Sequence, residues 1–137
     1  MRKNMSLLLK NDMSELGKLA QALDEYCAVN EIHKDILFKL NLALDEVVTN
    51  IVSYAYLDGL EHQIQVEFGV AGKTLLVTVI DDGIAFNPLA APSYKFNKSL
   101  ENREIGGLGI YFVTQVMDVI KYQRLEDHNV LFMQKSL

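Results

Sequence analysis

Basic residues, cysteine and histidine are all scarce in this sequence of 137 residues, and each shortage excludes a class of function. Thirteen Lys and Arg stand against 18 Asp and Glu, which gives a net charge of −5. This balance argues against a nucleic-acid-binding protein, because phosphate backbones require a basic face. The single cysteine, Cys27, allows no internal disulfide, so we expect a reducing cytoplasm. The histidines His33, His62 and His128 lack the spacing of metal ligands, so no histidine-based metal site is expected.

Long apolar runs are missing as well. The stretch MRKNMSLLLKND (1–12) contains three leucines, but Lys10 ends the run well before the length of a signal-peptide core. No segment approaches the roughly 18 consecutive apolar residues of a membrane span, so no membrane association is expected. Half of the residues are nevertheless hydrophobic, which is enough for a core, and the length suits a single domain over 1–137.

Hydrophobic periodicity predicts the order of the elements. Helical spacing predicts a first helix that begins near Asn11 or Asp12, with a capping box between Asp12 and Glu15, and ends near 29–30. The other expected elements are a strand at 6–10, a helix from 31–35 to about 56, a hairpin at 64–70 and 74–81, a helix at roughly 107–119, and a hairpin at 118–126 and 129–136 with its turn at 127–129. Strands in adjacent antiparallel pairs, with helices to cover one face, predict an α+β two-layer sandwich.

Residues 82–106 show no clear periodicity and contain both prolines, Pro88 and Pro92. A stretch of this length without regular structure inside a compact domain is usually functional or mobile. Polar motifs that could bind a ligand stand before it, at its start and at its end.

The stretch NLALDEVVTNIVSYAY (41–56) places Glu46 and Asn50 four residues apart in the second predicted helix. At about 100° per residue, the two positions differ by only about 40° around the helix axis, away from the apolar stripe. The pair is either part of a solvated face or two polar groups directed at a ligand.

In VIDDGIAFNP (79–88), Asp81, Asp82 and Gly83 directly follow a hydrophobic strand. A carboxylate at a strand end can accept a hydrogen bond from an exocyclic amine, and glycine lets a base approach the backbone. The alternative is a plain Asp-Gly turn.

In GGLGIYFV (106–113), Gly106, Gly107 and Gly109 stand at the start of a predicted helix. Exposed backbone N–H groups and the positive end of the helix dipole suit a phosphate there. The motif is not a Walker loop, because no Lys-Ser/Thr follows, and Phe112 stands where the dinucleotide fingerprint requires a third glycine. The alternative is a flexible hinge before a helix.

In order and spacing, these three motifs resemble the GHKL ATPase superfamily. Within it, ALDEVVTN, DDGIAFNP, GGLGIYFVTQVMDVIKY and the late Asn129 are similar to the small stand-alone anti-sigma-factor serine kinases of bacteria. The resemblance runs from about residue 10 to the C-terminus. It implies a Bergerat-type ATP-binding fold, with a mixed, mostly antiparallel sheet covered by about three helices. The histidine kinases of the superfamily need a further dimerisation and phosphoacceptor region, so that branch is not expected.

The resemblance also implies a role for each motif residue. Glu46 matches the general base and Asn50 the magnesium ligand, while Asp81 matches the residue that binds the adenine amino group. The remaining positions match an open base site (Gly83), a frequent second glycine (here Ala85), the glycine-rich phosphate site (Gly106, Gly107, Leu108 and Gly109) and an ATP lid at about 89–106, whose Arg103, Lys95 and Lys98 add positive charge. Arg103 either reaches the phosphates or is a solvated charge, and Lys95 and Lys98 have the same alternative of solvated lid charges. The chain departs from the family at Ala85 and at Tyr54, where many members carry histidine.

The function implied is an ATP- and magnesium-dependent serine protein kinase that is also an anti-sigma factor. Its expected partners are a sigma factor and an anti-anti-sigma protein of the STAS type, and a homodimer is the expected assembly. The alternative is a non-catalytic module of the same fold, in which ATP gates the binding of a protein. Retention of both Glu46 and Asn50 favours the enzyme, because a binding module needs no base.

Overall fold

The computed structural model describes residues 4–90 and 108–137. It contains a five-stranded sheet in the order β1-β2-β3-β5-β4, in which every pairing is antiparallel. The strands are β1 (Met5–Lys10), β2 (Gln63–Ala71), β3 (Thr74–Asp81), β4 (Val119–Leu125) and β5 (His128–Ser136). The helices are α1 (Leu16–Val29), α2 (Lys34–Tyr54) and α3 (Leu108–Val116), with short 3₁₀ turns at Met13–Glu15 and Pro88–Ala90.

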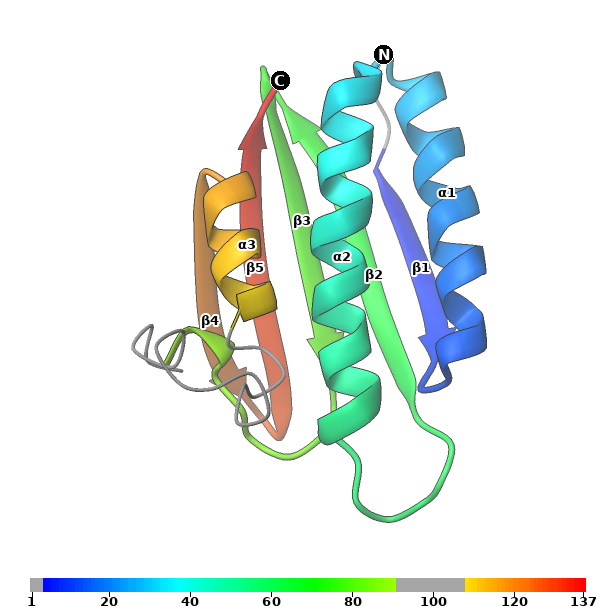
Figure 1. Ribbon diagram of the computed structural model, residues 1–137, viewed down its shortest axis with the longest axis vertical. Coiled ribbons are helices and arrows are strands. Elements are labelled where there is room, and N and C mark those ends of the chain that lie inside the picture. Colours follow the sequence, from blue (N-terminus) through cyan, green and yellow to red (C-terminus); the bar gives the residue numbers. More distant parts are fainter. Residues whose placement is uncertain (1–3, 91–107) are drawn as a thin grey trace.

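The helices α1, α2 and α3 all cover the same face of the sheet (Figure 1). Figure 1 shows α2 across the middle strands, α1 beside β1, and α3 over the β5–β4 edge. This arrangement confirms the predicted α+β two-layer sandwich. The sheet was expected to be mixed and mostly antiparallel, whereas the pairings between the five described strands are all antiparallel.

Period-two alternation in the strands and the apolar stripe of α2 together build the core. Side chains at alternate strand positions face the helices and are fully or almost fully buried: Ile64, Val66 and Phe68 on β2, Leu75, Val77 and Val79 on β3, and Leu131 and Met133 on β5. Leu40, Leu44, Val47 and Val48 of α2 pack against them. Burial of these side chains is the main stabilising term, because it removes apolar surface from water.

Local chemistry explains where α2 begins and ends. The ring Nδ1 of His33 accepts a hydrogen bond from the backbone N–H of Asp35 at 3.1 Å and so caps the N-terminus. At the other end, the carbonyl oxygen of Ala55 accepts from the backbone N–H of Ile84 at 2.9 Å. The end of α2 is therefore tied directly to the segment that follows β3.

Three predicted boundaries are wrong in detail. Glu15 bonds the backbone N–H of Lys10 at 2.8 Å, not that of Asp12, so no reciprocal capping box forms and α1 begins only at Leu16. The helix predicted to reach 119 ends at Val116, because Val119 already pairs with Gln134 in the sheet. The last turn lies at Glu126–Asp127, whose φ angles of 45° and 68° suit a tight hairpin, and not at 127–129.

Within the described residues, none of the helices combines the length and the apolar character that a membrane span requires.

Candidate functional site

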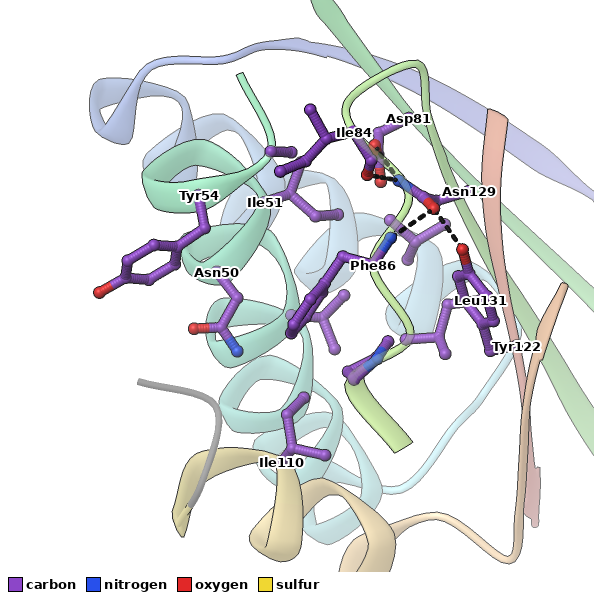
Figure 2. Close-up of a pocket in the computed structure, with 14 residues that line it drawn as sticks. Asn50, Ile51, Tyr54, Asp81, Ile84, Phe86, Ile110, Tyr122, Asn129 and Leu131 are labelled. Atoms are coloured by element: carbon purple, nitrogen blue, oxygen red, sulfur yellow. Dashed lines mark hydrogen bonds between the residues drawn. The ribbon is translucent and has the colours of Figure 1, made fainter. Parts of the chain in front are cut away.

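A cavity of about 100 Å³ opens between the C-terminal half of α2 and the ends of β3 and β5 (Figure 2). Its lining residues are Val47, Asn50, Ile51, Tyr54, Ala55, Val79, Asp81, Ile84, Phe86, Pro88, Ile110, Tyr122, Asn129 and Leu131. The walls are mainly apolar, and the polar side chains come from α2, β3, β4 and β5. The volume is below the roughly 300–1,000 Å³ of typical ligand pockets, so a ligand of nucleotide size would be enclosed only in part.

Asn50 is the least satisfied polar group of this cavity. Its side chain is only 6% exposed, and neither Oδ1 nor Nδ2 has a hydrogen-bond partner among the described residues. A buried polar atom without a partner costs on the order of 1–3 kcal/mol, and native proteins rarely retain one without a reason. A ligand in the cavity would supply the missing partners.

Asp81, at the end of β3, presents a buried carboxylate to the same cavity. It is 4% exposed, and its Oδ1 accepts hydrogen bonds from the backbone N–H of Gly83 and from Nδ2 of Asn129, each at 2.9 Å. Burial raises the pKa of Asp81, and these two donors oppose the rise because they stabilise the charged form. The carboxylate is thus held in one orientation beside an apolar wall.

Gly83 owes its identity to the packing of α2. A Cβ built on residue 83 would lie 2.5 Å from the Cβ and 2.6 Å from the carbonyl oxygen of Ala55, so no side chain fits there. Arg124 on β4 donates to the Gly83 carbonyl oxygen at 2.8 Å and braces the turn from the other side. The structure therefore gives Gly83 a packing role next to the cavity.

Glu46 and Asn50 share one edge of α2, as predicted, but they face different spaces. Asn50 lines the cavity, whereas Glu46 lines a neighbouring groove with Leu42, Gly109, Tyr111, Phe112 and Gln115. A Cβ at position 109 would overlap the Glu46 carboxyl group, so the helix α3 begins directly against this carboxylate. The next residue, Ile110, lines the cavity, so two consecutive residues at the start of α3 line the groove and the cavity.

Several predicted site residues fall elsewhere. Ala85 is exposed and is not among the lining residues of the cavity. Leu108 is the first residue of α3. Arg103, Gly106, Gly107, Lys95 and Lys98, with most of the predicted lid, lie outside the described residues.

Asn129 is a central member of the site, although the sequence points to it only as part of the family resemblance, without a role. It stands opposite Asp81 in the β3–β5 pairing, and it also bonds Ile84, Phe86 and Tyr122. One signal was available: Asn129 is a polar residue at an inward position of an alternating strand, two residues before the buried Leu131. Its partner, however, follows only from the register of two strands that are distant in sequence.

Comparison with known proteins places the chain in a family. The family model described as "Histidine kinase-like ATPase domain" matches residues 9–135, so the chain belongs to this family, and the resemblance to GHKL ATPases is confirmed. The chain is 33% identical over 101 residues to the serine-protein kinase RsbW of Bacillus mycoides, covering 71% of this chain and 62% of that protein. It is 31% identical over 94 residues to the serine/threonine-protein kinase BtrW of Bordetella bronchiseptica, covering 69% of this chain and 66% of that protein.

A solved structure agrees with the fold. The crystal structure of the RsbU and RsbW domains of Rv1364c from Mycobacterium tuberculosis superimposes with a TM-score of 0.72 over 98% of this chain and 32% of that chain, at 14% identity. This similarity supports the architecture alone. The chain spans somewhat less than two thirds of the length of the two kinases above, so their activity is carried over only as a proposal.

Proposed function

We propose that this chain binds ATP in the cavity between α2, β3 and β5 and transfers the γ-phosphoryl group to a serine of a partner protein. The observation that carries the proposal is Asn50, a buried amide that finds no hydrogen-bond partner within residues 4–90 and 108–137, beside the buried carboxylate of Asp81. Two convergent polar groups in a mainly apolar cavity are the usual pattern of a small-molecule site. Both relatives named above are called protein kinases, which supports the same activity here.

Asp81 is proposed to receive the adenine base. An ionised carboxylate accepts a hydrogen bond from the exocyclic amino group, and Ile51, Ile84 and Leu131 offer apolar contacts to the flat ring. A cavity of about 100 Å³ suits a base better than a whole nucleotide. The phosphates would then extend toward Asn50 and the start of α3, where backbone N–H groups and the helix dipole favour anions.

Magnesium fits this site through Asn50. The described residues contain no group of three or more His, Cys, Asp or Glu side chains that could hold a metal, so the protein would contribute chiefly the Asn50 amide oxygen. Magnesium prefers oxygen ligands and retains water, and phosphate oxygens would complete its shell. A bound ion would neutralise charge on the phosphates, which phosphoryl transfer requires together with positioning of the reactants.

Glu46 is proposed as the general base. It lies one helical turn from Asn50, in the groove lined by Gly109, and the next residue, Ile110, lines the cavity. A serine hydroxyl of a partner protein that enters this groove would donate its hydrogen to the Glu46 carboxylate while its oxygen faces the γ-phosphate. The groove is open to solvent and flanked by the partly exposed side chains of Leu42, Tyr111 and Phe112, which leaves room for a protein substrate.

The partner protein that receives the phosphoryl group is proposed to be an anti-anti-sigma protein of the STAS type. A sigma factor is proposed to compete with it for binding to this chain. The chain itself is proposed to be a homodimer in the cytoplasm. The proposal rests on the kinases of the same family. The test is phosphoryl transfer: wild type and Glu46→Gln are each incubated with γ-labelled ATP, magnesium and a lysate of the source organism. We expect a small labelled protein with wild type only, and equal ATP binding by both variants.

Equal labelling by wild type and Glu46→Gln would show that Glu46 is not the general base. No labelling by either, with ATP binding intact, would favour the module in which ATP only gates protein binding. No ATP binding at all would overturn both forms of the proposal.

A further inference from the structure

The side-chain amide of Asn129 connects three strands at the proposed base site. Asn129 is 6% exposed and stands opposite Asp81 on β3 and Arg124 on β4 in the strand register. Its Nδ2 donates to Asp81 Oδ1 at 2.9 Å and to the carbonyl oxygen of Ile84 at 2.8 Å. Its Oδ1 accepts from the backbone N–H of Phe86 at 3.2 Å and from the hydroxyl of Tyr122.

These four hydrogen bonds use the full capacity of the amide, which offers two donors and two acceptor lone pairs. Asn129 therefore has nothing left to offer a ligand, and its effect on a ligand must be exerted through its partners. Figure 2 shows the result: Asp81, Phe86 and Tyr122 all converge on Asn129 at one side of the cavity.

The orientation of the amide is determined by its neighbours. The backbone N–H of Phe86 can only donate, so the amide oxygen must face it, and the amide nitrogen must then face Asp81 and Ile84. A flipped amide would set donor against donor at Phe86 and acceptor against acceptor at Ile84. The Tyr122 hydroxyl adds a second donor to the oxygen side and strengthens the same choice.

The consequence at Asp81 is an asymmetric carboxylate. Among the described residues, both hydrogen bonds to Asp81 end on Oδ1, one from Asn129 and one from Gly83. Two N–H donors on one oxygen hold the plane of the carboxylate and favour its ionised form, which leaves Oδ2 as the acceptor for a ligand. An ionised acceptor attracts the amino group of adenine and repels the carbonyl oxygen that guanine presents at the same ring position.

We propose that Asn129, held by Tyr122, is a positioning residue that makes the site selective for a base with an amino donor, by fixing the orientation and the charge of Asp81. This inference rests on the proposed binding of ATP at Asp81. Asn129 does not contact the base itself. Its role is to keep the acceptor of Asp81 aimed and unprotonated, while the same amide holds the segment from Ile84 to Phe86 that forms the adjacent wall.

The pH dependence of ATP binding tests this role, because a purely structural effect of Asn129 would not shift it. Asp81 must be ionised to accept from an amino group, so ATP binding is lost as pH falls through its pKa. Loss of the Asn129 donor would raise that pKa further, so the acid limb of binding should move to higher pH. In the part of the chain that the structure describes, the other charged or titratable groups around Asp81 are Asp82, Arg124, Tyr56 and Tyr122, and Asn129→Ala changes none of them.

The experiment measures binding of non-hydrolysable ATP and GTP analogues by calorimetry, between about pH 5 and pH 8, for wild type and Asn129→Ala. We expect wild type to prefer ATP, and the variant to lose about tenfold of that preference, because one hydrogen bond to a charged group is lost while GTP affinity changes little. GTP carries the same phosphates as ATP, so it corrects for their own titration.

Asn30→Ala is the matched control, since Asn30 is another buried asparagine, 2% exposed, whose Nδ2 bonds the Tyr26 carbonyl oxygen at the end of α1. It should lower stability without changing the ATP-to-GTP ratio. Equal losses of ATP and GTP affinity in Asn129→Ala, or an unchanged ratio, would overturn the inference. Wild type that binds neither nucleotide would overturn the proposed function itself.

Tyr122→Phe keeps the ring and removes only the hydroxyl that donates to Asn129. The preference for ATP should fall in the same direction, by about two- to fivefold, with the acid limb at higher pH. If Asn129→Ala does not fold, this variant decides alone: an unchanged ratio and an unchanged acid limb would overturn the inference.

Discussion

Replacement of Asp81 by asparagine is expected to weaken ATP binding by about 5- to 140-fold while the fold is retained. The substituted amide can keep its Oδ1 as the acceptor for the Gly83 N–H and for Asn129 Nδ2, so the bonds within the protein survive. The amide nitrogen, however, would replace Oδ2 and turn an acceptor into a donor that faces the amino group of adenine. A lost hydrogen bond to a buried charged group is worth about 1–3 kcal/mol, which gives the range stated.

The same substitution should not destabilise the free protein. Burial raises the pKa of Asp81, so holding the ionised carboxylate beside the apolar wall of the cavity has a free-energy cost that a neutral amide avoids. We therefore expect an equal or higher melting temperature for Asp81→Asn without ATP. A variant that binds poorly because it is unfolded is thereby distinguished from one that has lost its acceptor.

Calorimetric titration with a non-hydrolysable ATP analogue and magnesium measures the effect. Asp82→Asn is the control, because Asp82 is the exposed neighbour whose carboxylate lies 3.4 Å from Nδ1 of His62 and not in the cavity. It should bind ATP as wild type does. Undiminished affinity in Asp81→Asn, or an equal loss in Asp82→Asn, would refute the assignment of the base to Asp81.

Asn50→Ala should remove most of the magnesium dependence of ATP affinity, because the amide oxygen proposed to hold the ion is gone. Titrations of ATP binding with magnesium and with EDTA measure this dependence, and an intact dependence would assign the ion to another residue. Gly109→Ala should lower the rate of phosphoryl transfer more than the affinity for ATP, because the new Cβ overlaps the Glu46 carboxyl group; wild-type rates in a steady-state assay would contradict that contact. A hydrogen bond with Asp58 raises the pKa of His62 in the folded protein. Charged His62 therefore stabilises the fold fully below its unfolded pKa of about 6.5, and this stabilisation is lost as pH rises through the folded pKa. His62→Gln should therefore lower the melting temperature more at about pH 5.5 than at about pH 8.5, and equal losses would show that the charge contributes nothing.

The helices, the hairpins and the layer architecture were predictable because they depend on local periodicity. Alternation in β2 and β3 and the apolar stripe of α2 directly determine which side chains face the core. The errors lie where two elements meet. The end of α3 depends on the pairing of Val119 with Gln134, which is distant in sequence. The last turn was misplaced because its two positive-φ positions hold Glu126 and Asp127, where glycine or asparagine is the usual signal of a tight hairpin.

The candidate site shows the same contrast between features that follow from local sequence and features that depend on tertiary packing. Asn50 and Asp81 were predicted as site residues because of their polar side chains, and both line one cavity. The separation of Glu46 from that cavity depends on how α3 packs against α2, which periodicity does not reveal. The partners of Asn129 depend on strand register, and the packing of Gly83 on Ala55 depends on where α2 ends against the turn after β3.

The central claim, that the nucleotide occupies the cavity between α2, β3 and β5, is tested most directly by a nuclear magnetic resonance titration of isotope-labelled protein with an ATP analogue and magnesium. The account predicts that the largest shifts of side-chain and backbone amide signals fall on Asn50, Gly83, Ile84 and Asn129, with saturation at one equivalent. Saturable shifts confined to the strand face opposite the helices, or the absence of any shift at the Asn50 side-chain amide, would contradict it.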